Sequence, residues 1–375
     1  MEPRFIPQME PWFDEAEAKA VFDYMKSGGW VMEFQKTEEL ERMIADFTGS
    51  ANCMMTVNGT VSLTIALLAL GLKNGDEVLV PNLTMIASPN AAALVGIVPV
   101  LVDIEEDTLC MDLHQAQEAL TPKTKALMYV PFNGRSGDME KVVQFCKKHR
   151  LSLIEDAAQA LGSYYKGKHL GTFGAFGSFS FSVPKVITTG QGGALVSDDA
   201  LSLQKARKLK DFGRSRGGID IHDEWGWNFK FTDIQAVIGI EQIKKLPWRL
   251  KRKKEIFKRY KDGLADLKDI QFIPTDLENT SPWFVDIFVR EPDTLLKFLK
   301  KESVESRRIY PAVHLQNIYR KSYAKKAFPI SEHYASLGLW LPSSSKLKDE
   351  EIDYVISVIR EYYNAQAKSK IKSKK

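Results

Sequence analysis

The sequence predicts an α/β protein with a large domain on a mostly parallel sheet, followed by a smaller α+β domain. Three observations support this prediction. Apolar strands alternate with helical stretches from about residue 60 to 210, the pattern changes near residue 250, and 375 residues exceed the usual size of one hydrophobic core. We therefore expect a large domain over residues 1–249, a small domain over 250–365 and a disordered basic tail over 366–375.

The expected elements of the large domain follow from hydrophobic periodicity. Residues 14–25 and 34–47 have the spacing of amphipathic helices, separated by Gly28-Gly29. Short apolar runs that end at turn residues predict strands at 77–80, 98–102, 126–130, 151–154 and 177–181. Helical patterns lie between them, at 86–95 and 139–149. This alternation is typical of parallel strands covered by helices on both faces.

The second half of the chain has longer helices and a different order of elements. Helices are expected at 200–211, 233–244 and 250–267, then strands at 270–273 and 283–289, and helices at 293–300 and 349–365. The change near residue 250 predicts the start of the smaller domain.

Composition narrows the class of protein. Hydrophobic residues make up 44% and charged residues 27% of the chain, which is ordinary for a globular protein and excludes a fibrous or disordered one. The net charge of +4 includes five lysines near the C-terminus, so the body is close to neutral and a role in nucleic-acid binding gains no support.

The same sequence predicts the cellular compartment and whether a metal site is present. No run approaches the ~18 apolar residues of a membrane span, and acids and prolines interrupt the N-terminus before a signal peptide could form. The three cysteines, Cys53, Cys110 and Cys146, have no CxxC spacing. We therefore expect a cytoplasmic protein without a membrane segment and without a metal site.

An acidic residue follows one predicted strand, in the segment Ile154-Glu155-Asp156-Ala157-Ala158. Ligands of open α/β sheets bind at the carboxyl ends of the strands. A carboxylate at this place can hold a pyridinium nitrogen protonated and so support a bound pyridoxal ring. Asp156 could equally cap the turn that follows it.

Lys185 lies after the next predicted strand, where a turn rich in glycine and threonine begins. Lys185 follows aromatic and β-branched residues, and burial there would lower the pKa of its amine and favour the neutral form that makes a Schiff base. Gly190, Gly192 and Gly193 would let the backbone approach a cofactor closely. A solvated surface lysine is the alternative, which Asp156 upstream makes the weaker one.

A third segment has the pattern of an anion site. Asn58-Gly59-Thr60 forms a tight turn before the apolar helix that begins near residue 63. Free backbone N–H groups at a helix start, beside a hydroxyl, suit a phosphate. The alternative is an N-terminal cap without a ligand.

Together these segments resemble the DegT-type sugar aminotransferases, within the fold-type-I pyridoxal-phosphate enzymes. The resemblance runs from about residue 6 to 363 and rests on five motifs that begin at residues 58, 155, 178, 188 and 226: Asn-Gly-Thr, Glu-Asp-Ala-Ala-Gln, Ser-Phe-Ser-Phe-Ser-Val-Pro-Lys, Thr-Thr-Gly-Gln-Gly-Gly and Gly-Trp-Asn-Phe-Lys-Phe-Thr-Asp-Ile-Gln-Ala. It implies an aspartate-aminotransferase-like large domain with a mostly parallel, seven-stranded sheet.

The resemblance also implies roles for individual residues. Lys185 would form the Schiff base with pyridoxal 5′-phosphate and carry a proton, and Asp156 would pair with the pyridine nitrogen. Gln159 would contact the hydroxyl side of the ring. The 5′-phosphate would be held by Gly59, Thr60 and Ser180, and by Asn228 from a neighbouring subunit.

That last role implies a homodimer with shared active sites, although residues 227–229 could instead be ordinary packing. Two departures from the family pattern concern the pocket walls. Met85 stands where relatives have an aromatic residue over the ring, and would cover it with a thioether. Residues 30–34, Trp-Val-Met-Glu-Phe, are bulkier than usual, which puts the shape of the sugar side in doubt.

Candidate substrate contacts are less specific. Arg214 and Arg216 occupy positions that face substrate in relatives, and arginine suits a diphosphate or a carboxylate; solvated surface charges are the alternative. His314 matches a position near the substrate, or is a structural loop histidine. Arg135 and Asp138, in the loop after residue 133, carry less weight.

The sequence therefore predicts an aminotransferase that converts a nucleotide-linked 4-keto-6-deoxy sugar to the 4-amino-4,6-dideoxy sugar, with glutamate as amino donor, for O-antigen or other glycan synthesis. A 3-keto-sugar aminotransferase and a non-catalytic regulator that binds cofactor or sugar remain open. A sugar dehydratase is disfavoured by Lys185, and a Rossmann nucleotide enzyme by the lack of GxGxxG after the first strand. The nucleotide and the sugar's stereochemistry are not determined.

Overall fold

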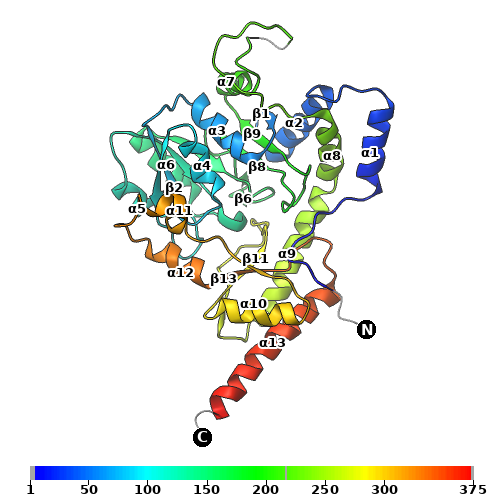
Figure 1. Cartoon of the computed structure of the whole chain (residues 1–375), viewed down its shortest axis with the longest axis vertical. Helices are drawn as coiled ribbons and strands as arrows, with labels where there is room; N and C mark the ends of the chain where they lie inside the picture. The colour runs from blue at the N-terminus through cyan, green and yellow to red at the C-terminus, as the bar shows by residue number, and fades with distance from the viewer. Residues whose placement is uncertain (1–4, 216–217, 373–375) are drawn as a thin grey trace.

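The computed structural model describes residues 5–215 and 218–372, with side chains described as far as residue 367. It has a large α/β part, which is the upper part in Figure 1, and a small part below it. Helix α9 (Leu246–Leu264) runs from the first part into the second.

The large part is built on a seven-stranded sheet in the order β1-β9-β8-β5-β4-β2-β3. Six strands run in one direction and β9 opposes them, because β9 pairs antiparallel with both of its neighbours. The strands are β1 (Asn52–Thr56), β2 (Glu77–Pro81), β3 (Val98–Val102), β4 (Thr124–Tyr129), β5 (Ser152–Asp156), β8 (Phe176–Ser180) and β9 (Gly193–Ser197). The predicted fold class, with a mostly parallel sheet of seven strands, is confirmed.

Each face of the sheet has its own hydrophobic core, because successive side chains of a strand point to opposite faces. In β2, Leu79 packs in one core while Val78 and Val80 pack in the other. Helices α2 (Gln35–Thr48), α6 (Met139–His149) and α8 (Asp233–Lys244) cover the first face. Helices α3 (Gly59–Ala69), α4 (Ala87–Ala93) and α7 (Ala200–Lys210) cover the second. Strands buried on both faces explain the continuous apolar runs in the sequence.

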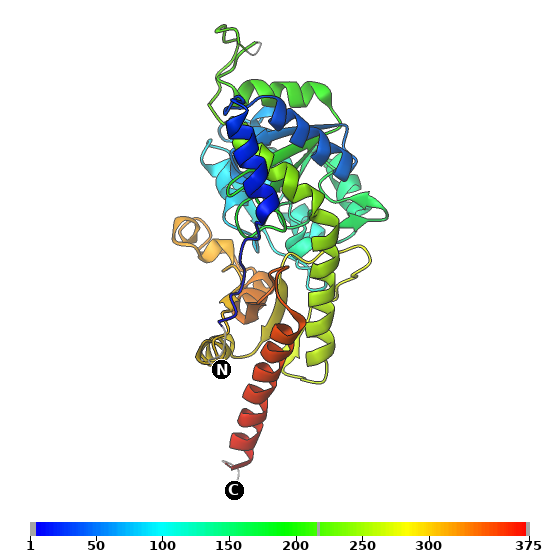
Figure 2. The same cartoon turned by 90° about the vertical axis from the view of Figure 1, so that its right-hand side faces the viewer.

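The small part has an antiparallel four-stranded sheet packed on helices. Its strand order is β10-β11-β13-β12. The elements are β10 (Ile270–Gln271), β11 (Val285–Val289), β12 (Arg307–Arg308), β13 (Gly338–Leu341), α10 (Pro292–Lys301) and α13 (Asp349–Lys372). Ile6 pairs with Val304 and packs in the core of this sheet, so the N-terminal segment crosses to the small part. Figure 2 shows this segment descending beside the large part.

Two features differ from the expected organisation. The expected boundary between residues 249 and 250 falls inside α9, which is one continuous helix. Helix α13 extends to Lys372 and projects away from the body, so residues 366–372 are helical where we expected a disordered tail.

The remaining elements connect these layers: α1 (Glu15–Lys26), α5 (Leu113–Glu118), η1 (Phe132–Gly134), the hairpin of β6 (Tyr164–Tyr165) and β7 (Lys168–His169), η2 (Val313–Leu315), α11 (Asn317–Arg320) and α12 (Pro329–Leu337). None of the described helices is long and apolar enough to cross a membrane.

Candidate active site

Asp156 ends strand β5, at the edge of the sheet where the parallel strands have their carboxyl ends. Its side chain is buried, and the Ser88 hydroxyl donates a hydrogen bond to Oδ2 at 2.6 Å. Within the described residues, the other oxygen, Oδ1, accepts only a long bond, 3.3 Å, from the Ala158 N–H. Burial raises the pKa of Asp156, while Ser88 and the nearby Lys185 oppose that rise. Oδ1 is therefore the carboxylate oxygen with acceptor capacity to spare.

Lys185 lies in the turn that follows β8, with its amine enclosed by protein. The Nζ atom is 4.0 Å from the centroid of the Trp283 ring. Burial lowers the pKa of Lys185 to about 8, the charge of Asp156 opposes this shift, and the charge of Arg307 adds to it. The charges of Lys185 and Asp156 each affect the pKa of the other, so the two side chains are within range of a direct electrostatic interaction. A substantial fraction of the amine is neutral near pH 8 and can act as a nucleophile.

An anion-binding cradle is formed where α3 begins. The Asn58 side chain caps the helix by accepting from the Val61 N–H at 2.9 Å. The N–H groups of Gly59 and Thr60 precede any carbonyl of the helix that could accept them. A methyl group on Gly59 would lie 3.0 Å from the Ser180 Cβ, so this helix start packs directly against the end of β8. Backbone N–H groups, the helix dipole and the Ser180 hydroxyl thus occupy one place.

Hydrogen bonds hold Gln159, and the turn that carries Met85, at this edge of the sheet. The Oε1 atom of Gln159 accepts the Asn133 N–H at 2.8 Å, and within the described residues its amide nitrogen has no hydrogen-bond partner. Ser88 also contacts the Thr84 hydroxyl at 3.0 Å, which fixes the turn that carries Met85. Met85 remains 42% exposed, and its sulfur accepts from the Ala87 N–H.

These groups fit pyridoxal phosphate. A carboxylate with a free acceptor oxygen suits a protonated ring nitrogen, an enclosed amine suits the aldehyde, and the cradle at α3 suits the phosphate. Among the residues the structure describes, no cluster of three or more histidine, cysteine and acidic side chains could hold a metal ion.

Asn228 and Arg214 belong to the segment that follows α7, which extends from the top of the large part in Figure 1; at its base, the Val57 N–H donates to the Phe229 carbonyl at 3.3 Å. Asn228 is exposed and its backbone pairs with Asp211. The Arg214 guanidinium bonds Asp211 at 3.0 Å and Asp220 at 2.9 Å. Arg216 lies outside the described residues. No contact in the described part of this chain joins Asn228 or Arg214 to Lys185.

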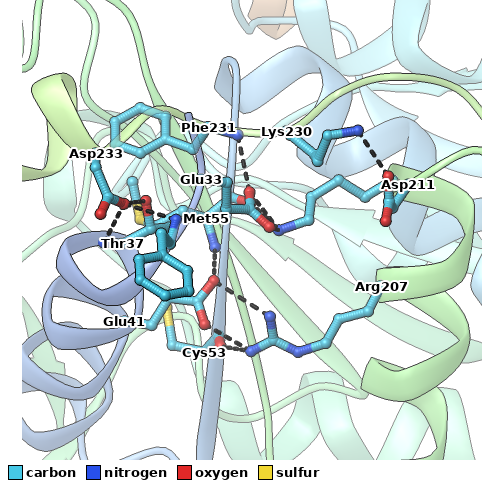
Figure 3. A network of polar contacts seen from close by, with 12 residues as sticks. Glu33, Thr37, Glu41, Cys53, Met55, Arg207, Asp211, Lys230, Phe231 and Asp233 are labelled. Atoms are coloured by element: carbon cyan, nitrogen blue, oxygen red, sulfur yellow. Dashed lines mark hydrogen bonds and ion pairs between the residues drawn. The ribbon is translucent and has the colours of Figure 1, made fainter. Parts of the chain in front are cut away.

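A network of charged side chains holds the base of that segment, and no pattern in the sequence indicated it (Figure 3). The buried amine of Lys210 bonds both oxygens of Glu33, and Glu33 accepts the Phe231 N–H at 2.9 Å. Lys230 bonds Asp211 at 2.6 Å. Beside them, Arg207 pairs with Glu41 at 2.6 Å, and Asp233 accepts four bonds from residues 34–37. Backbone bonds of 2.9 Å from Trp227 to Leu209 and from Phe229 to Lys210 fix the chain on both sides of Asn228.

Three other residues considered from the sequence have structural contacts. His314 is buried, with Nδ1 2.9 Å from the Asn82 amide and Nε2 3.2 Å from Glu332, so both ring nitrogens are engaged. Arg135 is buried and forms two bonds with Asp286 of β11, at 3.1 and 2.6 Å. Asp138 caps α6. Substrate binding by His314 stays a prediction.

Four residues near Lys185 were missed: Ser88, Trp283, Arg307 and Tyr310. Burial raises the pKa of Tyr310, the nearby charge of Arg307 opposes that rise, and the charge of Asp156 adds to it. Arg307 packs 4.6 Å from the Trp340 ring centroid and has no acidic partner among the described residues. Trp283, Arg307 and Tyr310 belong to the small part. No local pattern in the sequence indicates that they lie near Lys185 and Asp156 of the large part.

The model of the DegT/DnrJ/EryC1/StrS aminotransferase family matches residues 11–360. The chain belongs to this family. It is 35% identical to a GDP-perosamine synthase of Escherichia coli O157:H7, over 96% of this chain and 99% of that protein. It is 34% identical to a GDP-perosamine synthase of Vibrio cholerae, with the same shares covered.

Solved structures agree with this assignment. The sugar aminotransferase Spr1654 of Streptococcus pneumoniae, in its PLP form, has a TM-score of 0.88 and 29% identity, over 94% of this chain and 97% of that one. The aminotransferase TlmJ of Streptoalloteichus hindustanus has a TM-score of 0.91 and 28% identity, over 96% and 100%. The DegT-family member described here is thus an aminotransferase whose cofactor is pyridoxal phosphate, as the sequence predicted.

Proposed function

We propose that this enzyme transfers the amino group of glutamate to a nucleotide-linked 4-keto-6-deoxy sugar, giving a 4-amino-4,6-dideoxy sugar for O-antigen or other surface glycan assembly. The observation that carries the proposal is one buried site in which Lys185 and Asp156 interact, in a chain 35% identical over nearly its full length to a protein named GDP-perosamine synthase. A structural neighbour, DesI, was solved in the presence of its TDP-sugar product.

The catalytic roles follow from the two coupled groups. When bound, pyridoxal phosphate supplies a conjugated ring that takes up electron density from the reacting carbon. Asp156 holds a proton on the ring nitrogen, and Ser88 orients the carboxylate for that contact. Lys185 takes and returns the proton at the reacting carbon through Nζ, for which a pKa of about 8 is well matched.

The other residues bind and orient. The start of α3, at Gly59 and Thr60, and the Ser180 hydroxyl hold the phosphate, where the helix dipole favours negative charge. Gln159, whose amide nitrogen has no partner among the described residues, would contact the hydroxyl side of the ring, and Met85 would cover one ring face. Arg307 is suited to the donor's carboxylate, because its guanidinium has no acidic partner in the described chain.

We infer that the working form is a cytoplasmic homodimer in which Asn228 reaches the partner's cofactor phosphate. Several large apolar side chains are exposed on the single chain, and on a soluble monomer so many would be unusual. They lie in residues 30–34 and in the segment after α7, where Trp225 is 94% exposed. In this arrangement Arg214 lies next to the partner's site, where it can meet the diphosphate of the substrate.

The test is a panel of GDP-, UDP- and dTDP-linked 4-keto and 3-keto sugars, incubated with the purified enzyme and glutamate. We expect a 4-amino sugar, identified by mass spectrometry and NMR, and an equal amount of 2-oxoglutarate. The Lys185→Ala variant is the control and should give neither. A 3-amino product would replace the proposed substrate with the 3-keto class. Cofactor binding without turnover on any sugar of the panel would refute the proposed keto-sugar substrate.

A further inference from the structure

Trp283, from the small part of the molecule, makes two separate contacts with the turn that carries Lys185. Its indole N–H donates a hydrogen bond of 2.7 Å to the Pro184 carbonyl. Its ring lies 4.0 Å from the Lys185 Nζ, measured to the centroid. The Trp283 side chain is only 2% exposed. One buried side chain therefore contacts both the backbone before the lysine and the reactive atom of the lysine.

The position of Trp283 is itself fixed from two sides. Its ring stacks on Phe284, with centroids 4.0 Å apart, and meets the edge of Trp340 at 5.6 Å. The Phe284 backbone is held at both its N–H and its carbonyl by the Asn133 side chain, at 2.7 and 2.8 Å. The Asn133 N–H in turn bonds Gln159. Hydrogen bonds thus join the backbone next to Trp283 to the large domain's part of the site.

We propose that Trp283 is a positioning residue for Lys185: its N–H holds the turn in place, and its ring holds the amine whenever the lysine is not bonded to the cofactor. The proposal rests on the role of Lys185 in the proposed function. A transamination cycle frees this amine and requires its return in each half-reaction. A fixed resting place limits the rotamers that a long side chain would otherwise explore.

The two contacts have different physical consequences. An aromatic face attracts an ammonium group and so favours the charged form of the amine. It therefore opposes the burial that lowers the pKa of Lys185. The hydrogen bond acts on Pro184, which has no N–H of its own and anchors the turn through its carbonyl. A tryptophan that merely fills the core would affect stability and leave both properties unchanged.

Two variants separate these consequences. Trp283→Phe keeps an aromatic ring and removes the N–H, whereas Trp283→Leu removes both and keeps an apolar cover. Tyr260→Phe is the control, because Tyr260 is also buried in the small part, its hydroxyl has no hydrogen-bond partner among the described residues, and it packs in a different hydrophobic cluster from Trp283. The reactivity of Lys185 is measured on the full chain without cofactor, by labelling with acetic anhydride across pH and mass spectrometry of the lysine peptide. Recovery of visible absorbance on adding pyridoxal phosphate gives the loading rate.

We expect the midpoint of Lys185 labelling near pH 8 in the unmodified chain and lower by roughly half a pH unit in Trp283→Leu. In Trp283→Phe the midpoint should stay close to that of the unmodified chain, while cofactor loading should slow by roughly 2- to 10-fold, as for loss of one neutral hydrogen bond. Tyr260→Phe should change neither quantity.

A pH midpoint of Lys185 labelling in Trp283→Leu equal to that of the unmodified chain would overturn the proposed role of the ring. Cofactor loading rates in Trp283→Phe equal to those of Tyr260→Phe would overturn the proposed role of the indole N–H. If the leucine variant does not fold, the phenylalanine variant and its control still decide the second part. The labelling uses no sugar, so this proposal can fail or hold independently of which substrate the panel identifies.

Discussion

The hydrogen bond from Ser88 to Asp156 gives the sharpest test of the proposed catalytic pair. Asp156 is buried, which raises its pKa, and the 2.6 Å bond from Ser88 is the first of the contacts that oppose this rise. Hydrogen bonds to charged groups contribute about 1.5–3 kcal/mol. At 1.36 kcal/mol per unit, loss of this bond corresponds to about one to two pH units. Ser88→Ala should therefore make Asp156 easier to protonate.

The assay is the pH profile of kcat/KM for sugar amination. Asp156 must be ionised to hold the proton on the ring nitrogen, so a raised pKa moves the acid limb of the profile upward by about one to two pH units. Ser88→Thr keeps a hydroxyl and should retain the original limb. Ser197→Ala is the control, because it removes another buried serine bond, 2.7 Å to the Ala175 carbonyl, at the opposite edge of the sheet. An acid limb that Ser88→Ala leaves unmoved would refute this reasoning.

Three further predictions follow from the geometry. Gly59→Ala should weaken cofactor affinity at least tenfold, measured by fluorescence titration, because the added methyl group would lie 3.0 Å from Ser180 at the phosphate cradle; an affinity equal to that of the unmodified chain would contradict the cradle. Asp286→Ala should cost about 3–5 kcal/mol in urea denaturation by leaving Arg135 buried and unpaired, and Asp286→Leu with Arg135→Met should recover most of that loss. Cofactor loading should rise with pH and level off above about 8, since the neutral Lys185 amine reacts and its pKa is about 8; a rate still rising steeply at pH 10 would contradict the lowered pKa.

Elements with local signals were the ones that could be predicted. Helix α6 occupies Met139–His149 as expected, because Asp138 caps it, accepting the Glu140 and Lys141 N–H groups. Helix α8 begins after Thr232 for the same reason. Strands β1 and β9 were not assigned from the sequence, since each pairs with the other across about 140 residues and β1 lacks β-branched residues except at its end.

For the site too, residues with a local sequence signal could be predicted, and residues brought in by long-range packing could not. Asp156 and Lys185 were found because a strand end and a glycine-rich turn are visible in consecutive residues. Trp283 and Arg307 lie about 100 residues further along, and only the packing of the small sheet brings them to Lys185. The same holds for the crossing of Ile6 to the small part.

The adjacent acids Glu155 and Asp156 show how strand geometry divides structural from functional roles. Successive side chains of β5 point to opposite faces. Glu155 accepts the N–H groups of Gly171, Phe173 and Gly174 at 2.6–2.9 Å, and so fixes the turn that leads into β8. Asp156 points to the face that Ser88 and Lys185 occupy. Burial raises the pKa of Glu155 to about 7 although three donors face it, so this acid is costly to bury and its contribution is the placement of β8. Lys185 follows β8. Glu155 therefore positions the strand that leads to the lysine, whereas Asp156 interacts with the lysine amine itself.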